Sequence, residues 1–305
     1  MGPALLAAFF FALSAVFAHR TTRLVGALTA NVARLWLAVG MLGVAAAAHG
    51  PALRGASLKT FLVSGVVGYG LGDLALFWAY PRLGSRLTSL LMQCLSSPLA
   101  AGIEWLWLGT RPGTAALVCG AAILVGVGLA IAPGKTVAGR GAPTLDPAQR
   151  AAGLAFGVVA ALGQAGGAVI SRKAFALAHA AGEDIDGFTA SFQRALGGVA
   201  AISLVYVLSL ALRRGRGVEP AADWRAAWPW VVATALAGAT LGVSFFQRAL
   251  AFTPSAVVMP VIALTPLMVV PLAYFLEHER PGVRSLLGGA VAVAAAVALA
   301  WVRVG

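Results

Sequence analysis

The stretch GYGLGDLALFWAY at Gly68–Tyr80 returns in part as GATLGVSFFQRAL at Gly238–Leu250, and this echo decides the fold. The two stretches share a Gly-x-x-x-Gly pair and a later alanine at the same spacing. Two further sets recur in the same order on either side: Thr29, Ala30 and Arg34 return as Thr189, Ala190 and Arg194, and Arg111, Pro112 and Gly113 return as Arg280, Pro281 and Gly282. The common order of these three sets predicts an internal duplication, in which one structural unit occurs twice in the chain. In a hydrophobic chain, such a duplication is typical of a transporter whose site lies between the halves.

The composition indicates a protein of the lipid bilayer. Hydrophobic residues make up 60% of the 305 residues and charged residues only 10%, whereas roughly 25% of a soluble domain is charged. Ten apolar runs have about the length of a membrane-crossing helix, at residues 3–18, 27–47, 61–80, 87–108, 114–132, 151–171, 187–211, 228–250, 255–276 and 283–302. They do not alternate between apolar and polar residues, as barrel strands do. The sequence therefore predicts an all-α integral membrane protein with ten transmembrane helices.

The longest connection between these runs, residues 133–150, is rich in proline and glycine and separates five runs from five. We expect a first repeat at 1–137, a linker at 138–150 and a second repeat at 151–305, each repeat with five transmembrane helices. Because five is odd, the second repeat enters the membrane from the opposite face. The expected fold is therefore a pair of inverted five-helix repeats, related by an axis in the membrane plane.

The order of several motifs resembles the EamA group of the drug/metabolite transporter (DMT) superfamily, with two EamA-like repeats over essentially the whole chain. The resemblance rests on an arginine early in the second helix of each unit, a proline in each fourth helix, and an acid–arginine boundary before the last helix. These residues are Arg34 and Arg194, Pro98 and Pro266, and Glu279–Arg280, where the first unit has Thr110 before Arg111. The Gly72–Asp73 step is also similar to some bacterial members.

The resemblance implies a ten-helix secondary carrier, multi-pass in the plasma (cytoplasmic) membrane of a bacterium, that works by alternating access. It implies an exporter of a small metabolite such as an amino acid or an amine. Membrane lipids and a coupling proton are the further expected partners, and the protein acts as a monomer or a homodimer. Members usually keep both termini in the cytoplasm, but the distribution of Lys and Arg over the connections favours the reverse. The orientation therefore stays open.

Arg34 and Asp73 are charges inside predicted spans, and a charge there is costly unless it is paired or hydrated. Arg34 lies about seven residues into the run 27–47, and Asp73 lies about seven residues before the end of 61–80. At 1.5 Å per residue, both groups sit about 10 Å from the same membrane surface. We expect Asp73 to be held near Arg34, either as a substrate-amine or proton site or as a structural ion pair between two helices.

Aromatic residues share a helix face with Asp73, because Tyr69, Phe77 and Tyr80 follow the i±4 and i+7 spacing. Rings beside an acid hold a cationic or aromatic ligand; rings also pack in a core, so both interpretations stay open. In the second half, Asp73 corresponds to Val243. This divergence fits a site that serves one substrate, and drift explains it equally.

Polar side chains at helical spacing mark further candidates. Gln93 and Gln164 lie in the fourth and sixth runs, and Ser244 and Gln247 lie on one stripe of the eighth. Such residues line a hydrated cavity or bond helices together. The predicted substrate-binding set is therefore Asp73, Arg34, Tyr69, Phe77, Gln93, Gln164, Ser244 and Gln247.

Two other charges are expected to play smaller roles. Arg194 mirrors Arg34, but the second half offers no mid-span acid to pair with it. Glu277 follows the ninth run and is expected to reach the solvated interface.

Pro98 and Pro266 interrupt helical runs, and proline removes a backbone donor and kinks a helix. Each proline is either a hinge or a simple bend.

Several classes of function are excluded. The net charge of +12 is spread over short loops without a basic, aromatic-lined face, so we expect no nucleic-acid partner. Cys94 and Cys119 lie in separate spans as packing residues, and no His–acid spacing suits a metal. Gly134-Lys135-Thr136 resembles the end of a phosphate-binding loop, but Leu129 occupies the required glycine position. We therefore expect no enzyme activity, no metal and no cofactor.

Two alternatives to a metabolite carrier stay open. One is a flippase for lipid-linked substrates, which would favour a lateral opening between helices. The other is an intramembrane transferase, which needs several acids or histidines at one interface. Only the end of the run 255–276 comes near that arrangement.

Overall fold

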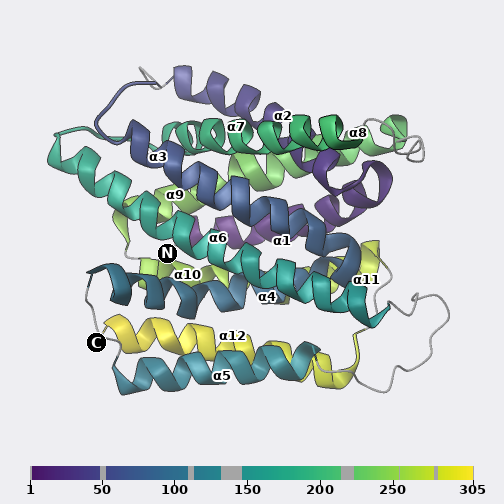
Figure 1. The fold of residues 1–305 in the computed structure, drawn as a ribbon. Coiled ribbons are helices and arrows are strands. Elements are labelled where there is room, and N and C mark those ends of the chain that lie inside the picture. Colours follow the sequence, from purple (N-terminus) through teal and green to yellow (C-terminus); the bar gives the residue numbers. More distant parts are fainter. Residues whose placement is uncertain are drawn as a thin grey trace.

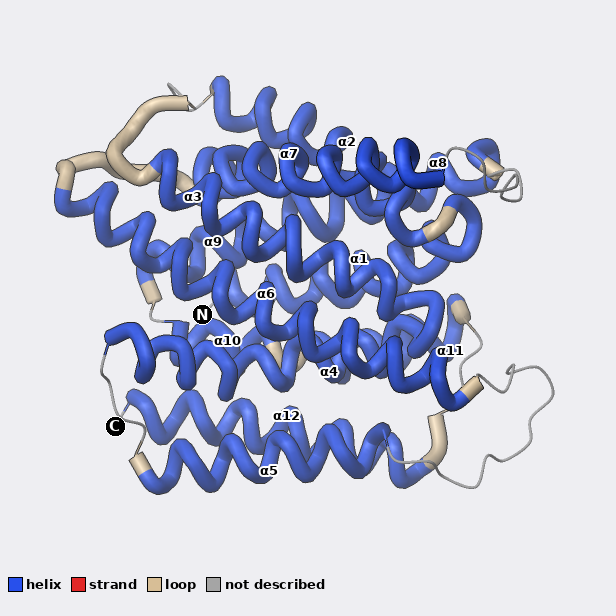
Figure 2. The backbone as a smooth tube through the Cα atoms, viewed as in Figure 1, coloured by secondary structure: helices blue, strands red, loops and turns tan. Residues whose placement is uncertain are grey.

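The computed structural model describes residues 2–48, 53–108, 113–131, 146–213, 223–253, 255–277 and 281–304. Every regular element within these residues is a helix, which confirms the predicted all-α class (Figure 2). Residues 109–112, with Thr110 and Arg111, residues 278–280, with Glu279 and Arg280, and residues 138–145 of the predicted linker lie outside the described residues.

The helices follow one another with short connections. The first half contains α1 (Gly2–Val25), α2 (Ala27–Ala47), α3 (Leu58–Gly65), the π-helix η1 (Val66–Asp73), α4 (Leu74–Leu108) and α5 (Thr114–Ile131). The second half contains α6 (Pro147–Ala180), α7 (Gly187–Arg213), α8 (Trp224–Thr234), the π-helix η2 (Ala235–Gly242), α9 (Val243–Phe252), α10 (Ser255–Ile262), α11 (Thr265–Leu276) and α12 (Val283–Val304). The helices lie side by side along one common direction (Figure 1).

Seven helices in the described part of the chain are long and apolar enough to cross a membrane. They are Gly2–Val25, Ala27–Ala47, Leu58–Trp107, Pro147–Ala180, Gly187–Leu212, Trp224–Phe252 and Val258–Leu276. Leu117–Ala130 and Val283–Leu299 are shorter apolar helices beside them. These lengths and compositions describe a multi-pass membrane protein.

Two glycines in the left-handed region reverse the chain without a loop. Gly26 has φ 81° between α1 and α2, and Gly84 has φ 77° inside α4. A side chain strains this backbone conformation, so glycine is the residue that permits it. Gly84 thus divides α4 at the boundary that the sequence places between the runs 61–80 and 87–108.

The repeated Gly-x-x-x-Gly pairs share an unusual backbone conformation. Both η1 and η2 are eight-residue π-helices, and each contains one of the two pairs. A π-helix bonds each residue to the fifth along, which widens the helix, and it is frequent at functional sites. The repeated sequence motif thus coincides with a repeated backbone conformation. Sequence periodicity did not predict these two π-helices.

Glycines bring several helices into backbone contact. A side-chain carbon on Gly72 of η1 would lie 3.1 Å from the Gly163 Cα of α6. On Gly126 of α5, it would lie 2.8 Å from the Gly288 carbonyl oxygen of α12. Small residues allow helices in a membrane to approach this closely. Gly163 thus lets α6 pack directly against η1.

The helices divide into a central group and a peripheral pair. α5 and α12 lie side by side at the lower edge of Figure 1, whereas α1, η1, α6 and α9 occupy the middle of the bundle. The buried apolar clusters link α1 to helices of the second half, including Phe246 and Val269. The centre of the protein is thus built by residues from both halves.

Candidate functional site

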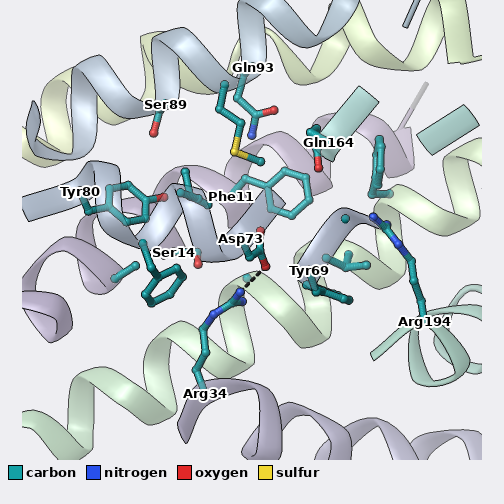
Figure 3. A pocket seen from close by; sticks show the side chains of 18 residues that line it. Phe11, Ser14, Arg34, Tyr69, Asp73, Tyr80, Ser89, Gln93, Gln164 and Arg194 are labelled. Carbon is teal, nitrogen blue, oxygen red and sulfur yellow. Dashed lines mark hydrogen bonds and ion pairs between the residues drawn. The ribbon is translucent and has the colours of Figure 1, made fainter. Parts of the chain in front are cut away.

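A small cavity lies among the central helices. Its lining comes from α1, α2, η1, α4, α6, α7, η2 and α9, which belong to both halves of the chain (Figure 3). The free volume is about 50 Å³, well below the roughly 300–1,000 Å³ of a typical small-molecule pocket. In this conformation the helices close tightly around the charged groups described below.

Arg34 and Asp73 form an ion pair at this cavity, as their predicted depth required. The Arg34 Nη2 donates to the Asp73 Oδ2, and the two side chains are only 5% and 13% exposed. The Arg34 Nε donates to the Asn31 Oδ1 at 3.0 Å, which fixes the guanidinium from its own helix. Removing two charges from water is unfavourable unless they pair with good geometry. The cavity therefore contains a buried, internally neutral pair.

The predicted aromatic face of Asp73 also lines the cavity. The Arg34 guanidinium carbon lies 4.6 Å from the Phe77 ring centre and 5.9 Å from that of Tyr69. Phe77 meets Tyr80 edge to face, with 5.8 Å between their ring centres. Rings at these distances stabilise a cation through their electron-rich faces. The aromatic residues thus support the ion pair and leave apolar walls around it.

The predicted polar residues divide into two groups. Gln93 and Gln164 line the cavity, and each has a buried amide atom without a hydrogen-bond partner, Oε1 of Gln93 and Nε2 of Gln164. Ser244 and Gln247 are buried but do not line it; the α9 residues that do so are Val243 and Phe246. Ser244 and Gln247 thus lie next to the lining residues of α9 but not among them in this conformation, and a role for them in substrate binding stays a prediction.

The two predicted hinge prolines lie outside the cavity lining. Pro98 lies within α4, and Pro266 occupies the first turn of α11, after the two-residue break at Ala263 and Leu264. Proline suits the first helical turn, where its missing N–H is not needed. The break before Pro266 separates α10 from α11, and hinge motion at either proline stays a prediction.

Arg194 is the cavity residue that sequence reasoning left out of the site. It lies on α7, is 2% exposed, and has a buried Nε without a hydrogen-bond partner. Its guanidinium carbon lies 5.3 Å from the Tyr69 ring centre, and Figure 3 shows it across the cavity from Arg34. The signal in the sequence was its correspondence to Arg34, and we set it aside because no acid was available to pair with it.

Each arginine lies against the repeated glycines of the other half. A side-chain carbon on Gly68 would collide with the Arg194 guanidinium, and one on Gly238 would lie 4.0 Å from the Arg34 Nη1. The second-helix arginine of one half therefore faces the third-helix glycine of the other half, in both directions. This reciprocal arrangement places the cavity at the meeting of the two halves.

A polar cluster connects three helices beside this centre. The Glu277 Oε1 lies 2.9 Å from the His19 Nδ1, and the Ser85 Oγ donates to the Glu277 Oε2 at 2.8 Å. The side chains of His19 and Glu277 are 14% and 12% exposed. Glu277 is thus partly buried and held by two side chains, because the Gly84 turn brings Ser85 against it. Its expected position at the solvated interface stays a prediction. Ala18, next to His19, lines the cavity.

Among the described residues, no three His, Cys, Asp or Glu side chains gather into a metal-binding group. Cys94 and Cys119 are free thiols, and Cys94 packs among buried apolar side chains. The functional groups that the cavity offers are thus two guanidinium groups, one carboxylate, two amides, hydroxyl groups and aromatic rings. Charged, amide and hydroxyl groups within apolar walls are the combination that is typical of small-molecule sites.

Comparison with known proteins agrees with this arrangement. No curated protein matches the chain. A crystal structure of a protein aligns over 97% of this chain and 96% of its own, with a TM-score of 0.67 and 16% sequence identity, which shows a shared fold. The sequence model of the EamA-like transporter family matches twice, at residues 3–132 and 151–301. The chain therefore belongs to the EamA-like transporter family, a family of membrane transporters.

Proposed function

We propose that this protein is a secondary carrier that moves a small metabolite across the membrane by alternating access. The observation that carries the proposal is the buried Arg34–Asp73 pair in a cavity that both halves line. Charged residues within a membrane are costly and rare, and they typically mark substrate or ion pathways. The family supports transport, and the position of the cavity supports a site that each half closes in turn.

We propose ten membrane-crossing helices in two inverted repeats. Leu58–Trp107 turns back at Gly84 and so supplies two crossings, and the shorter helices α5 and α12 supply two more. Five crossings in each half invert the second half relative to the first. The reciprocal contacts of Arg34 with Gly238 and of Arg194 with Gly68 are what such an axis produces.

The size of the cavity supports a conformational cycle. A free volume of about 50 Å³ does not admit an amino acid or an amine, so binding requires the central helices to separate. Pro98 and the break before Pro266 are the proposed hinges, since kinked helices bend where a backbone bond is missing. The His19–Glu277–Ser85 cluster holds α1, α4 and the end of α11 together in the closed form.

We propose export across a bacterial cytoplasmic membrane, with a proton as the coupling ion. Among the described residues that line the cavity, Asp73 is the only acid, so a transported proton would be carried there. Protonation would release Arg34 from the pair. Neither alternative function, the lipid flippase or the transferase, gains a specific observation from the cavity.

Flux through reconstituted vesicles tests the proposal. Purified protein is placed in liposomes, and uptake of labelled amino acids, amines and organic acids is measured with and without a proton gradient. The proposal expects saturable uptake of at least one compound that excess unlabelled compound suppresses. Uptake equal to that of protein-free vesicles for every compound, in a preparation that unfolds cooperatively on heating, would contradict it.

A further inference from the structure

The cavity has more positive than negative charge. Its lining contains the cations Arg34 and Arg194 and one acid, Asp73, and that acid is bound to Arg34. Within the described residues, the Arg194 side chain forms no hydrogen bond and no ion pair, and its Nε is buried without a partner. A buried guanidinium without a counter-charge is unfavourable in a membrane. The site is therefore electrostatically incomplete by one negative charge.

The two halves differ in what surrounds their arginines. Asn31 and Asp73, which bind Arg34, correspond in the repeat to Ser191 and Val243. The second half thus keeps the cation but has an apolar residue where the first half has the acid. Val243 itself lines the cavity. With an apolar residue at the position of the acid, the charge of Arg194 is left to be met by something from outside the chain.

Neighbouring residues hold the Arg194 guanidinium in a defined position. Gly68 and Gly167 form a notch for its guanidinium, because a side-chain carbon on Gly68 would collide with it and one on Gly167 would lie 2.7 Å from its Nη2. Tyr69 covers another side at 5.3 Å. The guanidinium is thus held in place by packing while its hydrogen-bonding capacity stays unused.

We propose that Arg194 binds the carboxylate of the transported molecule, and that the preferred substrates are small organic monoanions with an apolar or aromatic body. This inference rests on the proposed transport function. Guanidinium and carboxylate groups match in planar, bidentate geometry. One carboxylate neutralises the cavity, whereas an amine adds a second unpaired cation. The rings of Phe11, Tyr69 and Phe246 line the space for the body of the ligand.

Two probes with the same phenylethyl body and opposite charge separate these cases: 3-phenylpropionate and phenylethylamine. Binding to the purified full chain in detergent is measured by calorimetry and by the shift in melting temperature, with hexanoate as an aliphatic monocarboxylate. We expect 3-phenylpropionate to bind at least tenfold more tightly than phenylethylamine. Equal binding of the amine, or no binding of either monocarboxylate, would overturn the inference.

Substitutions at Arg194 and Val243 test whether the carboxylate of the ligand binds to Arg194. Arg194→Gln removes the cation and is expected to weaken 3-phenylpropionate binding at least tenfold. Val243→Asp supplies an internal counter-charge and is expected to weaken it at least tenfold more than Val243→Asn, which has the same shape without the charge. Unchanged binding in Arg194→Gln, or equal effects of the two Val243 variants, would overturn the assignment.

The outcome is separable from that of the proposed function. Vesicle flux of phenylethylamine without flux or binding of the monocarboxylates would support a carrier and refute the role of Arg194. Binding of 3-phenylpropionate that depends on Arg194, without flux of any compound, would support the anion site and refute the carrier.

Discussion

Arg34 and Arg194 occupy corresponding positions in the two halves and line the same cavity, but of the two only Arg34 pairs with a carboxylate of the described residues. The two arginines show how duplication and divergence together produce a site. Duplication places two guanidinium groups at the centre, one from each half. Divergence at Asp73 and Val243 leaves one of them neutralised within the chain and the other available to a ligand.

The ion pair makes a first prediction about stability. Asp73→Asn leaves Arg34 buried without its counter-charge, and breaking a buried pair from one side destabilises a protein by about 3–5 kcal/mol. Arg34→Gln leaves the Asp73 carboxylate unpaired in the same way. The double variant removes both charges and should be more stable than either single variant, as measured by melting temperature in detergent. Additive losses in the double variant would mean that the two residues do not interact.

The glycine notch makes a second prediction. Gly68→Ala places a methyl group against the Arg194 guanidinium, and overpacking of this kind costs about 1–3 kcal/mol. Gly40→Ala is the matched control, because a side-chain carbon at Gly40 meets no atom within 4 Å. We expect a lower melting temperature for the first variant and none of that loss for the second. Equal melting temperatures would argue against the close packing of Arg194 on η1.

The contact between α5 and α12 makes a third prediction. Gly126→Leu forces a large side chain against the backbone of Gly288 and Ala292, whereas Gly128, two residues away, has open space around it. We expect Gly126→Leu to lower the melting temperature strongly and Gly128→Leu to leave it nearly unchanged. A similar effect of both leucines would show that these helices do not meet at Gly126.

The His19–Glu277–Ser85 cluster makes a fourth prediction, about access to the cavity. Glu277→Ala removes the acceptor that joins α1 to α4, so the helices should separate more often. The measurement is the rate of maleimide labelling at Ala18→Cys, in a background with Cys94→Ala and Cys119→Ala. We expect faster labelling when Glu277 is replaced. An unchanged labelling rate would show that the His19–Glu277–Ser85 cluster does not hold the cavity closed.

Much of the fold follows from local sequence properties. Apolar length predicted the helices and the duplicated motifs predicted the two halves, because both depend on composition and order alone. The meeting of Arg34 and Asp73 followed from depth, since a rise of 1.5 Å per residue converts position into height. The shared cavity of both residues confirms that this estimate placed them at one level.

What sequence reasoning missed depended on contacts between distant residues. Ser244 and Gln247 share the helix α9 with Val243 and Phe246, but only the latter two line the cavity. Which side of a helix meets a cavity depends on its packing against distant segments, and helical spacing alone does not show it. Arg194 was set aside because no acid could pair with it. Its place at the cavity depends on the packing of Gly68 and Gly167 around its guanidinium, which sequence spacing does not reveal.

The central claim is that Asp73 serves transport rather than stability alone. The most direct measurement is proton-gradient-driven flux of a transported compound into vesicles, compared between wild type, Asp73→Asn and the control Glu183→Gln, whose acid lies on a connecting loop and not in the cavity lining. Vesicles with equal amounts of folded protein are compared. We predict that Asp73→Asn loses the dependence on the gradient while Glu183→Gln keeps it. Equal gradient-driven flux in Asp73→Asn and wild type would contradict the account.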